Sequence, residues 1–171
     1  MFVLNHFRWY AFSIQHLSFN IQHSTLTWIC KKFDELTPLE LYAIMRLRNE
    51  VFVVEQNCVF QDADNKDQQC YHLAAWQENM LIAYTRIVPA GIIYDQISIG
   101  RVVTSPHHRG AGTGKLLMEK SIQYAHDFFG KLPIKIGAQL YLKQFYESLS
   151  FVQSSDIYLE DGIEHIQMIR Q

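Results

Sequence analysis

The chain has 171 residues, the size of one domain, and 49% of them are hydrophobic, which is ample for one packed core. Lys and Arg number 15 against 17 Asp and Glu, and this net charge of -2 lacks the basic excess of a general nucleic-acid binder. The three cysteines form no CxxC pair, which disfavours a disulfide framework or zinc knuckle and favours a reducing, cytoplasmic setting. No apolar run approaches the ~20 residues needed to cross a bilayer, which disfavours a membrane protein.

The beginning of the chain differs from the rest. Arg8 is the only formal charge before residue 24, and the first acidic residue is Asp34. No continuous apolar segment of the length found in a secretory signal is present. We expect residues 1–25 to be an N-terminal extension and residues 26–171 to be the domain. A packing arm or dimer contact and a targeting segment are the alternatives for the extension.

The domain is expected to open with a short strand at 26–33, followed by a helix. Thr37 suits the N-cap, Pro38 the first helical position, and Glu40 completes a capping-box pattern. Apolar residues then follow at helical spacing as far as Phe52. Together these signals predict a helix that starts at Pro38.

A polar stretch at 61–69 follows this helix. We expect it to be a solvated loop, although Asp62, Asp64 and Asp67 could instead attract a cationic amine. The stretch lacks the Gly and the final Glu of a calcium loop. His107 and its neighbour His108 are adjacent in sequence and cannot easily face one metal. We therefore predict no metal site.

The rest of the chain alternates between strand and helix patterns. Strands are expected at 71–76, 81–88, 97–104, 134–138, 157–160 and 166–169, and helices at 113–129 and around 142–149. This order predicts an α/β domain with a mixed central sheet and helices packed on it. The helical connection between strands 97–104 and 134–138 predicts that these two strands are parallel neighbours.

A glycine-rich loop joins the strand at 97–104 to the helix at 113–129. It reads Arg109, Gly110, Ala111, Gly112, Thr113, Gly114, Lys115. A helix N-terminus presents unpaired N–H groups and a partial positive charge, and glycines allow a phosphate to approach the backbone. Arg109 and Lys115 add positive charge at the rim. The loop is therefore predicted to be an anion cradle.

Two common phosphate-binding motifs do not fit this loop. A Walker A loop needs G-x-x-x-x-G-K-[ST], but residue 109 is Arg and Leu116 stands where Ser or Thr would hold magnesium. A dinucleotide fingerprint needs G-x-G-x-x-G, and this loop is G-x-G-x-G. The pattern [QR]-x-x-G-x-[GA], by contrast, fits in full from Arg109 to Gly114.

With this loop the chain resembles the GNAT acetyltransferase superfamily and, within it, the ElaA-like family, over residues 26–170. The stretches that carry the resemblance are 48–56 (RNEVFVVEQ), 100–103 (GRVV), 109–114, 137–139 (GAQ), 145–146 (FY) and 158–163 (YLEDGI) with His165. Two positions depart from the family pattern, because Ser150 replaces a usual Gly and Glu164 replaces a usual Pro.

The resemblance implies a single-domain GNAT fold whose two neighbouring parallel strands splay apart to admit acetyl-CoA, which would donate its acetyl group to an amine of open identity. The implied cofactor-binding residues are Arg101, Val102, Val103, Arg109, Gly110, Ala111, Gly112, Thr113, Gly114, Lys115, Gln139 and Tyr146. Tyr146 is the candidate acid, and Glu55 is the preferred candidate base over His72, Glu164 and His165. Neither a nucleic acid nor a membrane partner is expected, and a homodimer is plausible.

Two other functions remain open at this point. The chain could be a non-catalytic module that binds acyl-CoA. Residues 46–89 also resemble acyl-homoserine lactone synthases, which share the GNAT-like core but lack an intact R-x-x-G-x-G loop. Product analysis would separate an acyltransferase from a synthase, and turnover would separate both from a binding module.

Overall fold

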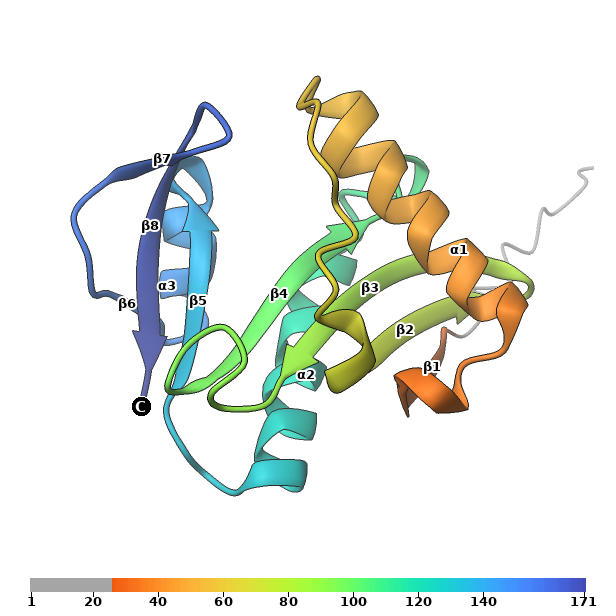
Figure 1. Ribbon diagram of the computed structural model, residues 1–171, viewed down its shortest axis with the longest axis horizontal. Helices are drawn as coiled ribbons and strands as arrows, with labels where there is room; N and C mark the ends of the chain where they lie inside the picture. The colour runs from red at the N-terminus through yellow and green to blue at the C-terminus, as the bar shows by residue number, and fades with distance from the viewer. Residues whose placement is uncertain (1–25) are drawn as a thin grey trace, which may run out of the picture.

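One mixed sheet organises the chain, and it divides between two parallel strands (Figure 1). The computed structural model describes residues 26–171, so the expectation for residues 1–25 lies outside the described part. The strands are β1 (Thr27–Lys32), β2 (Tyr71–Gln77), β3 (Met80–Val88), β4 (Ile97–Thr104), β5 (Ile134–Gln139), β6 (Val152–Gln153), β7 (Tyr158–Glu160) and β8 (Ile163–Arg170). Their order is β1-β2-β3-β4-β5-β8-β6, and β7 pairs with β8.

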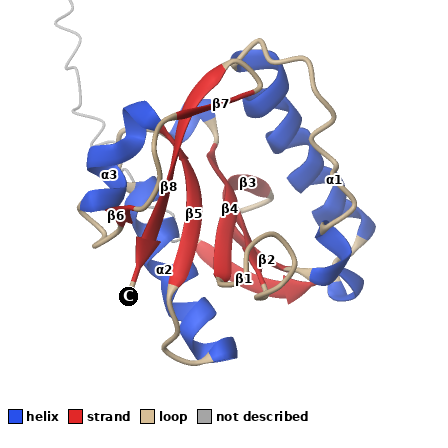
Figure 2. Ribbon diagram, turned by 60° about the vertical axis from the view of Figure 1, so that its left-hand side comes forward, coloured by secondary structure: helices blue, strands red, loops and turns tan. Residues whose placement is uncertain are grey.

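Helices cover both faces of this sheet (Figure 2). They are α1 (Pro38–Arg48), which continues as a π-helical segment (Asn49–Glu55), α2 (Thr113–Phe129) and α3 (Lys143–Glu147). In Figure 1, α1 lies in front of β3 and β4, whereas α2 lies behind them. The predicted α/β domain with a mixed sheet flanked by helices is confirmed.

The start of α1 is the predicted capping box. The Thr37 hydroxyl accepts a hydrogen bond from the backbone N–H of Glu40 at 3.2 Å, and the Glu40 carboxylate accepts one from the Thr37 N–H at 2.8 Å. Glu40 also pairs with Lys31 of β1 at 2.8 Å. The helix start is thereby tied to the edge of the sheet.

The strands β4 and β5 are parallel, as predicted, but they stay together only briefly. They pair at Ile97 with Ile134 and at Ser98 with Lys135, and then diverge towards the top of Figure 1. On its other side β4 carries a bulge, because Tyr84 pairs with Val103 while Arg86 pairs with Gly100. Arg101 lies inside this bulge with a φ of 52°. A bulge bends its strand, so this one contributes to the divergence.

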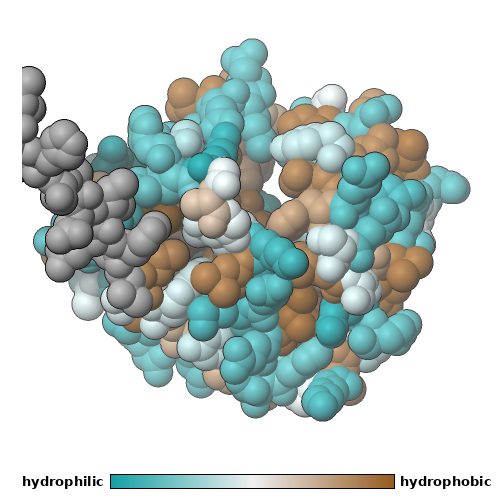
Figure 3. All heavy atoms as spheres, turned by 180° about the vertical axis from the view of Figure 1, so that it is seen from behind, coloured by the Kyte–Doolittle hydropathy of each residue, from teal (hydrophilic) through white to brown (hydrophobic). Residues whose placement is uncertain are grey.

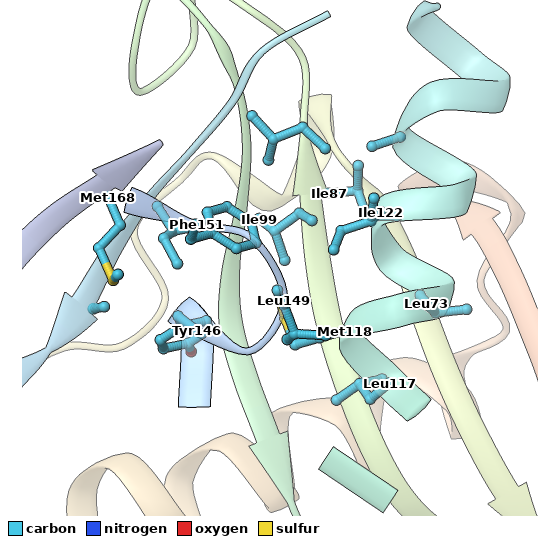
Figure 4. Packing of buried hydrophobic residues seen from close by; sticks show 14 of the residues in the cluster. Leu73, Ile87, Ile99, Leu117, Met118, Ile122, Tyr146, Leu149, Phe151 and Met168 are labelled. Atoms are coloured by element: carbon cyan, nitrogen blue, oxygen red, sulfur yellow. The ribbon is translucent and has the colours of Figure 1, made fainter. Parts of the chain in front are cut away.

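The main core fills the space between the sheet and the helices α2 and α3 (Figure 4). Met118, Ile122 and Ala125 are buried and form an apolar stripe along α2. Tyr146 and Phe151 close the core on the side of β5 and β8. α2 therefore packs against β3 and β4, and α3 packs against β6.

The expectation of a solvated loop at 61–69 is wrong for its acidic residues. Asp62 and Asp67 are buried, and both contact Arg48, which is fully buried. The loop packs inwards because a buried guanidinium group needs carboxylate partners. The aspartates are thus bound to arginines rather than free to attract an amine.

Two smaller findings complete the fold. The two-residue strand β6 was not predicted, because two residues leave no periodic pattern. Within residues 26–171, no helix is both long and apolar enough to span a lipid bilayer.

Candidate active site

A cavity of about 530 Å³ lies where β4 and β5 diverge. Figure 3, which shows the face that carries α2 and α3, displays a deep hollow in the upper half of the molecule. Seven of the predicted site residues line the cavity, namely Glu55, Arg101, Val102, Val103, Arg109, Gln139 and Tyr146. Segments that are distant in the sequence therefore meet around one opening in the sheet.

A second hollow of about 370 Å³ adjoins the first at the N-terminus of α2. Arg109, Gly110, Gly112, Thr113, Gly114 and Lys115 line it. Arg109 and Thr104 belong to the walls of both hollows, so the glycine-rich loop continues the cavity between the strands. Ala111 lies in the same loop but lines neither hollow.

The glycines of this loop differ in their roles. Gly110 and Gly112 have φ values of 88° and 77°, a conformation that L side chains rarely adopt. A Cβ atom at either position would meet no atom within 4 Å, so the space above both residues is open. Only Gly114 lies within α2, and Gly110 and Gly112 precede the helix. The loop thus presents bare backbone to an open hollow.

Glu55 and Arg109 form a two-pronged ion pair across the mouth of the cavity. Arg109 donates to the two carboxylate oxygens of Glu55 at 2.6 and 2.8 Å. The hydrogen bonds from Arg109 hold the pKa of the Glu55 carboxyl below its usual range. In this state Glu55 is a weaker base than an isolated carboxylate.

Gln139 and Gln56 also meet across the divergence of the strands. The Gln139 side chain at the end of β5 donates to the Gln56 side-chain oxygen at 3.3 Å. Both residues line the cavity. This hydrogen bond joins the end of β5 to the residue that follows the π-helical segment.

Tyr146 reaches the cavity from α3 and is only 5% exposed. Its ring packs edge-on against Phe145 and Phe151, with centroid distances of 5.0 and 6.1 Å. Burial raises the pKa of the Tyr146 hydroxyl well above that of free tyrosine. The hydroxyl therefore stays protonated near neutral pH and can act as a proton donor.

Arg101 contributes to the cavity wall but its side chain is bound elsewhere. Its Nε lies 2.6 Å from Oδ1 of Asp62, and its guanidinium donates to the Asp62 carbonyl at 3.2 Å. This ion network, which Arg48 and Arg86 complete, was not predicted from the sequence. Arg86 inside a mostly apolar strand was the available signal, because such a charge requires buried partners.

The histidines named as alternative bases lie in different surroundings. His72 is buried outside the cavity, with Nδ1 2.8 Å from the Tyr84 hydroxyl and Nε2 3.0 Å from the Asp67 carbonyl oxygen. His165 lines the cavity and has Nδ1 2.8 Å from the Ile163 carbonyl. Across the described part of the chain, no three His, Cys, Asp or Glu side chains are grouped so as to hold a metal ion.

Most of the chain is similar to known proteins. A family model described as an acetyltransferase (GNAT) domain matches residues 46–171. The chain is 38% identical over 148 residues to Protein ElaA of Escherichia coli K12, which covers 85% of this chain and 97% of that protein.

Solved structures extend this similarity to three dimensions. An acyl-CoA N-acyltransferase from Pseudomonas aeruginosa is 42% identical, with a TM-score of 0.83 over 86% of this chain and 100% of that one. The crystal structure of Escherichia coli ElaA is 37% identical, with a TM-score of 0.81 and the same coverage of 86% and 100%. The chain belongs to the GNAT acetyltransferase superfamily and, within it, to the ElaA-like family.

Proposed function

We propose that the protein transfers an acetyl group from acetyl-CoA to an amine. The observation that carries this proposal is the continuity of the cavity between β4 and β5 with the hollow at the N-terminus of α2. One elongated anionic thioester could occupy both hollows, with its phosphates at the helix and its acyl group between the strands. Its setting is proposed to be the reducing cytoplasm, where Cys30, Cys58 and Cys70 stay as free thiols.

The residues present fit coenzyme A. The backbone of β4 beyond Ser98 has no β5 partner, so Val102 and Val103 offer polar groups to a pantetheine chain. The open backbone of Gly110 and Gly112 and the first turn of α2 suit the diphosphate. Arg109 and Lys115 stand at the rim of the same hollow.

The transfer requires an uncharged amine, an acyl carbon and a proton donor. The amine nitrogen attacks the thioester carbonyl and forms a C–N bond, and the C–S bond then breaks. The amine loses a proton to a base, and the departing thiolate gains one. We assign the second proton to Tyr146, whose buried hydroxyl lines the cavity. A backbone N–H near Val102 is the proposed donor to the oxyanion.

Glu55 remains the proposed base, under one condition set by its ion pair. Arg109 lowers the pKa of Glu55 in the free protein, so the carboxylate must lose that partner before it can accept a proton efficiently. Phosphates in the adjoining hollow would compete for Arg109. Cofactor binding and release of Glu55 are thus proposed to be coupled.

Thiol release from acetyl-CoA in the presence of pooled amines tests this function directly. Amine-dependent release, with an acetylated amine identified by mass spectrometry, is the expected result. Calorimetric binding of CoA thioesters without release for any amine would favour the non-catalytic module. A product formed only from acyl carrier protein and S-adenosylmethionine would favour the synthase. Absence of any CoA thioester binding would overturn the proposal.

A further inference from the structure

The charges that line the cavity are almost all neutralised within the protein. Arg86 pairs with Asp64 and Asp67, Arg101 pairs with Asp62, and Arg109 pairs with Glu55. Every guanidinium group in the cavity wall therefore already has a carboxylate partner. None is left over to bind an acceptor that carries a carboxylate.

Two carboxylates in the same wall, by contrast, make no ion pair with any described residue. Glu160 and Asp161 lie at the turn between β7 and β8 and line the cavity. The ion pairs of residues 26–171 include neither of them. The net charge of this part of the wall is therefore negative, which favours a cationic ligand group.

Two tyrosines share the wall of the cavity with the exposed Glu160 or adjoin it in β7. Burial, Tyr94 and Glu160 together raise the pKa of Tyr158 to about 12, which places both tyrosines and the carboxylate in one electrostatic environment. The hydroxyls of Tyr158 and Tyr94 both approach Gly137 of β5, where an added Cβ would stand 3.2 Å from each. Glycine at residue 137 therefore leaves room for the pair of hydroxyls beside the carboxylate.

The same cavity wall also carries apolar side chains. Phe60, Ile93 and Ile163 are among its lining residues. The Cys58 thiol contacts the Asp161 carbonyl at 3.7 Å, which joins the turn to the segment that follows the π-helical residues. Lys135 lies over the Tyr94 ring, 4.9 Å from its centroid, and makes no ion pair with Glu160. The wall thus combines apolar side chains with two carboxylates, Glu160 and Asp161, that make no ion pair within residues 26–171.

We propose that this wall, defined by Phe60, Ile93, Tyr94, Glu160 and Ile163, selects an acceptor that carries a second cationic group, of the alkyl diamine class. The inference rests on the proposed acyltransferase function. The neutral amine would face the acyl group between β4 and β5, the alkyl chain would lie on the apolar side chains, and the distal ammonium would pair with Glu160. Amino acids that keep a free carboxylate would be repelled by Glu160 and Asp161.

The test compares two acceptors with the same alkyl chain, of which only one carries a second amino group. Acetyl-CoA turnover is measured with 1,4-diaminobutane and with butylamine, at low salt and at 0.5 M salt. A partly exposed ion pair should raise kcat/KM for the diamine about fivefold over the monoamine, and added salt should reduce that ratio. In Glu160→Gln the ratio should fall towards about two, the statistical factor for two equivalent amines against one. Glu78→Gln, which removes a charge from the β2–β3 turn, should keep the wild-type ratio.

The outcomes separate this inference from the function on which it rests. Turnover of both amines at equal efficiency, or a preference that survives undiminished in Glu160→Gln, would overturn the inference and leave the acyltransferase intact. If neither amine is acetylated, calorimetric titration of the CoA-loaded protein decides the question. Tighter binding of the diamine that is lost in Glu160→Gln would support the binding wall alone, and equal or absent binding would overturn it.

Discussion

Asp62 holds Arg101 by both its side chain and its backbone, with Oδ1 2.6 Å from Nε and the carbonyl oxygen 3.2 Å from the guanidinium. Arg101 is the bulged residue of β4, and its φ of 52° is one that a residue with a Cβ rarely adopts. Such conformations persist where the surroundings enforce them. Asp62, fixed in turn by Arg48, therefore keeps the bulge that turns β4 away from β5.

Replacing Arg101 by glycine or by alanine should separate the backbone conformation from the ion pair. Both variants lose the contact with Asp62, but only glycine adopts the φ of 52° without strain. Arg101→Ala should be less stable than Arg101→Gly by ~1 kcal/mol in urea unfolding. Elsewhere in a strand alanine is more stable than glycine, so the reversed order is the diagnostic result. Equal stability, or a more stable Ala variant, would show that the bulge is not enforced.

Local patterns in the sequence sufficed for the elements that frame the site. The limits of α2 were predicted because an apolar stripe and a terminal Gly130 lie within one continuous segment. The parallel relation of β4 and β5 followed from the helix that joins them. These features depend on residues that are close together in the chain.

The polar contacts that shape the site were not predictable in the same way. Asp62 and Arg101 are separated by 39 positions, and Glu55 and Arg109 by 54. An aspartate in a polar segment has the same local pattern whether it faces water or a buried arginine. Pairing across such separations depends on how the sheet and the loops pack, which no local period encodes.

Ser150 offers a test of a position where the chain departs from its family. The residue follows α3 with a φ of 67°, so the usual glycine at this site has a backbone reason. Ser150→Gly should stabilise the protein by up to ~1 kcal/mol, because relief of the strain exceeds the added entropy of the unfolded chain. Thermal and urea unfolding measure the change. The matched variant Ser150→Ala, which keeps the Cβ, should bring no gain.

The stability of the protein should fall as the pH decreases from 7. Burial lowers the pKa of His72, so its contribution is present above the unfolded value of ~6.5 and is lost below it. Burial alone would raise the pKa of Asp64 and Asp67. Arg86 lowers the pKa of both carboxyls, helped by Arg101 at Asp64 and by Arg48 at Asp67, and that contribution to stability is lost below pH ~4.

Urea unfolding at several pH values tests the histidine part of this dependence. Between pH 6.5 and 5, the free energy of unfolding should fall with a slope of up to ~1.4 kcal/mol per pH unit from His72. His72→Gln should flatten the curve in that interval, although its stability at pH 7 should also be lower because two buried hydrogen bonds change. A variant curve parallel to the wild-type curve would contradict the assignment.

Glu55→Gln should produce two changes of opposite sign. The variant removes the negative charge that occupies Arg109, so affinity for CoA should rise several-fold in calorimetry at low salt. Loss of a base should lower kcat at the same time, by about 100-fold or more. Tighter CoA binding with an unchanged kcat would confirm that the Glu55–Arg109 ion pair competes with CoA. The same result would show that Glu55 takes no part in the catalytic step.

Tyr146→Phe should slow transfer while it keeps the fold. Phenylalanine preserves the edge-on packing against Phe145 and Phe151, and only the hydroxyl that lines the cavity is lost. General acid catalysis contributes on the order of 10²–10⁴ in rate, and a fall in kcat within that range is expected, with CoA affinity retained. Tyr141→Phe, which changes an exposed hydroxyl of the same cavity, is the matched control.

The leaving group provides the decisive comparison for Tyr146. A thioester whose thiol is more acidic than that of CoA departs as a thiolate without needing a proton, so an aryl thioester should be affected much less by Tyr146→Phe. Because burial raises the Tyr146 pKa, the wild-type advantage with acetyl-CoA should also persist to at least pH 9. Equal rate losses for both thioesters would assign Tyr146 to positioning, since a donor of the leaving-group proton must discriminate between them.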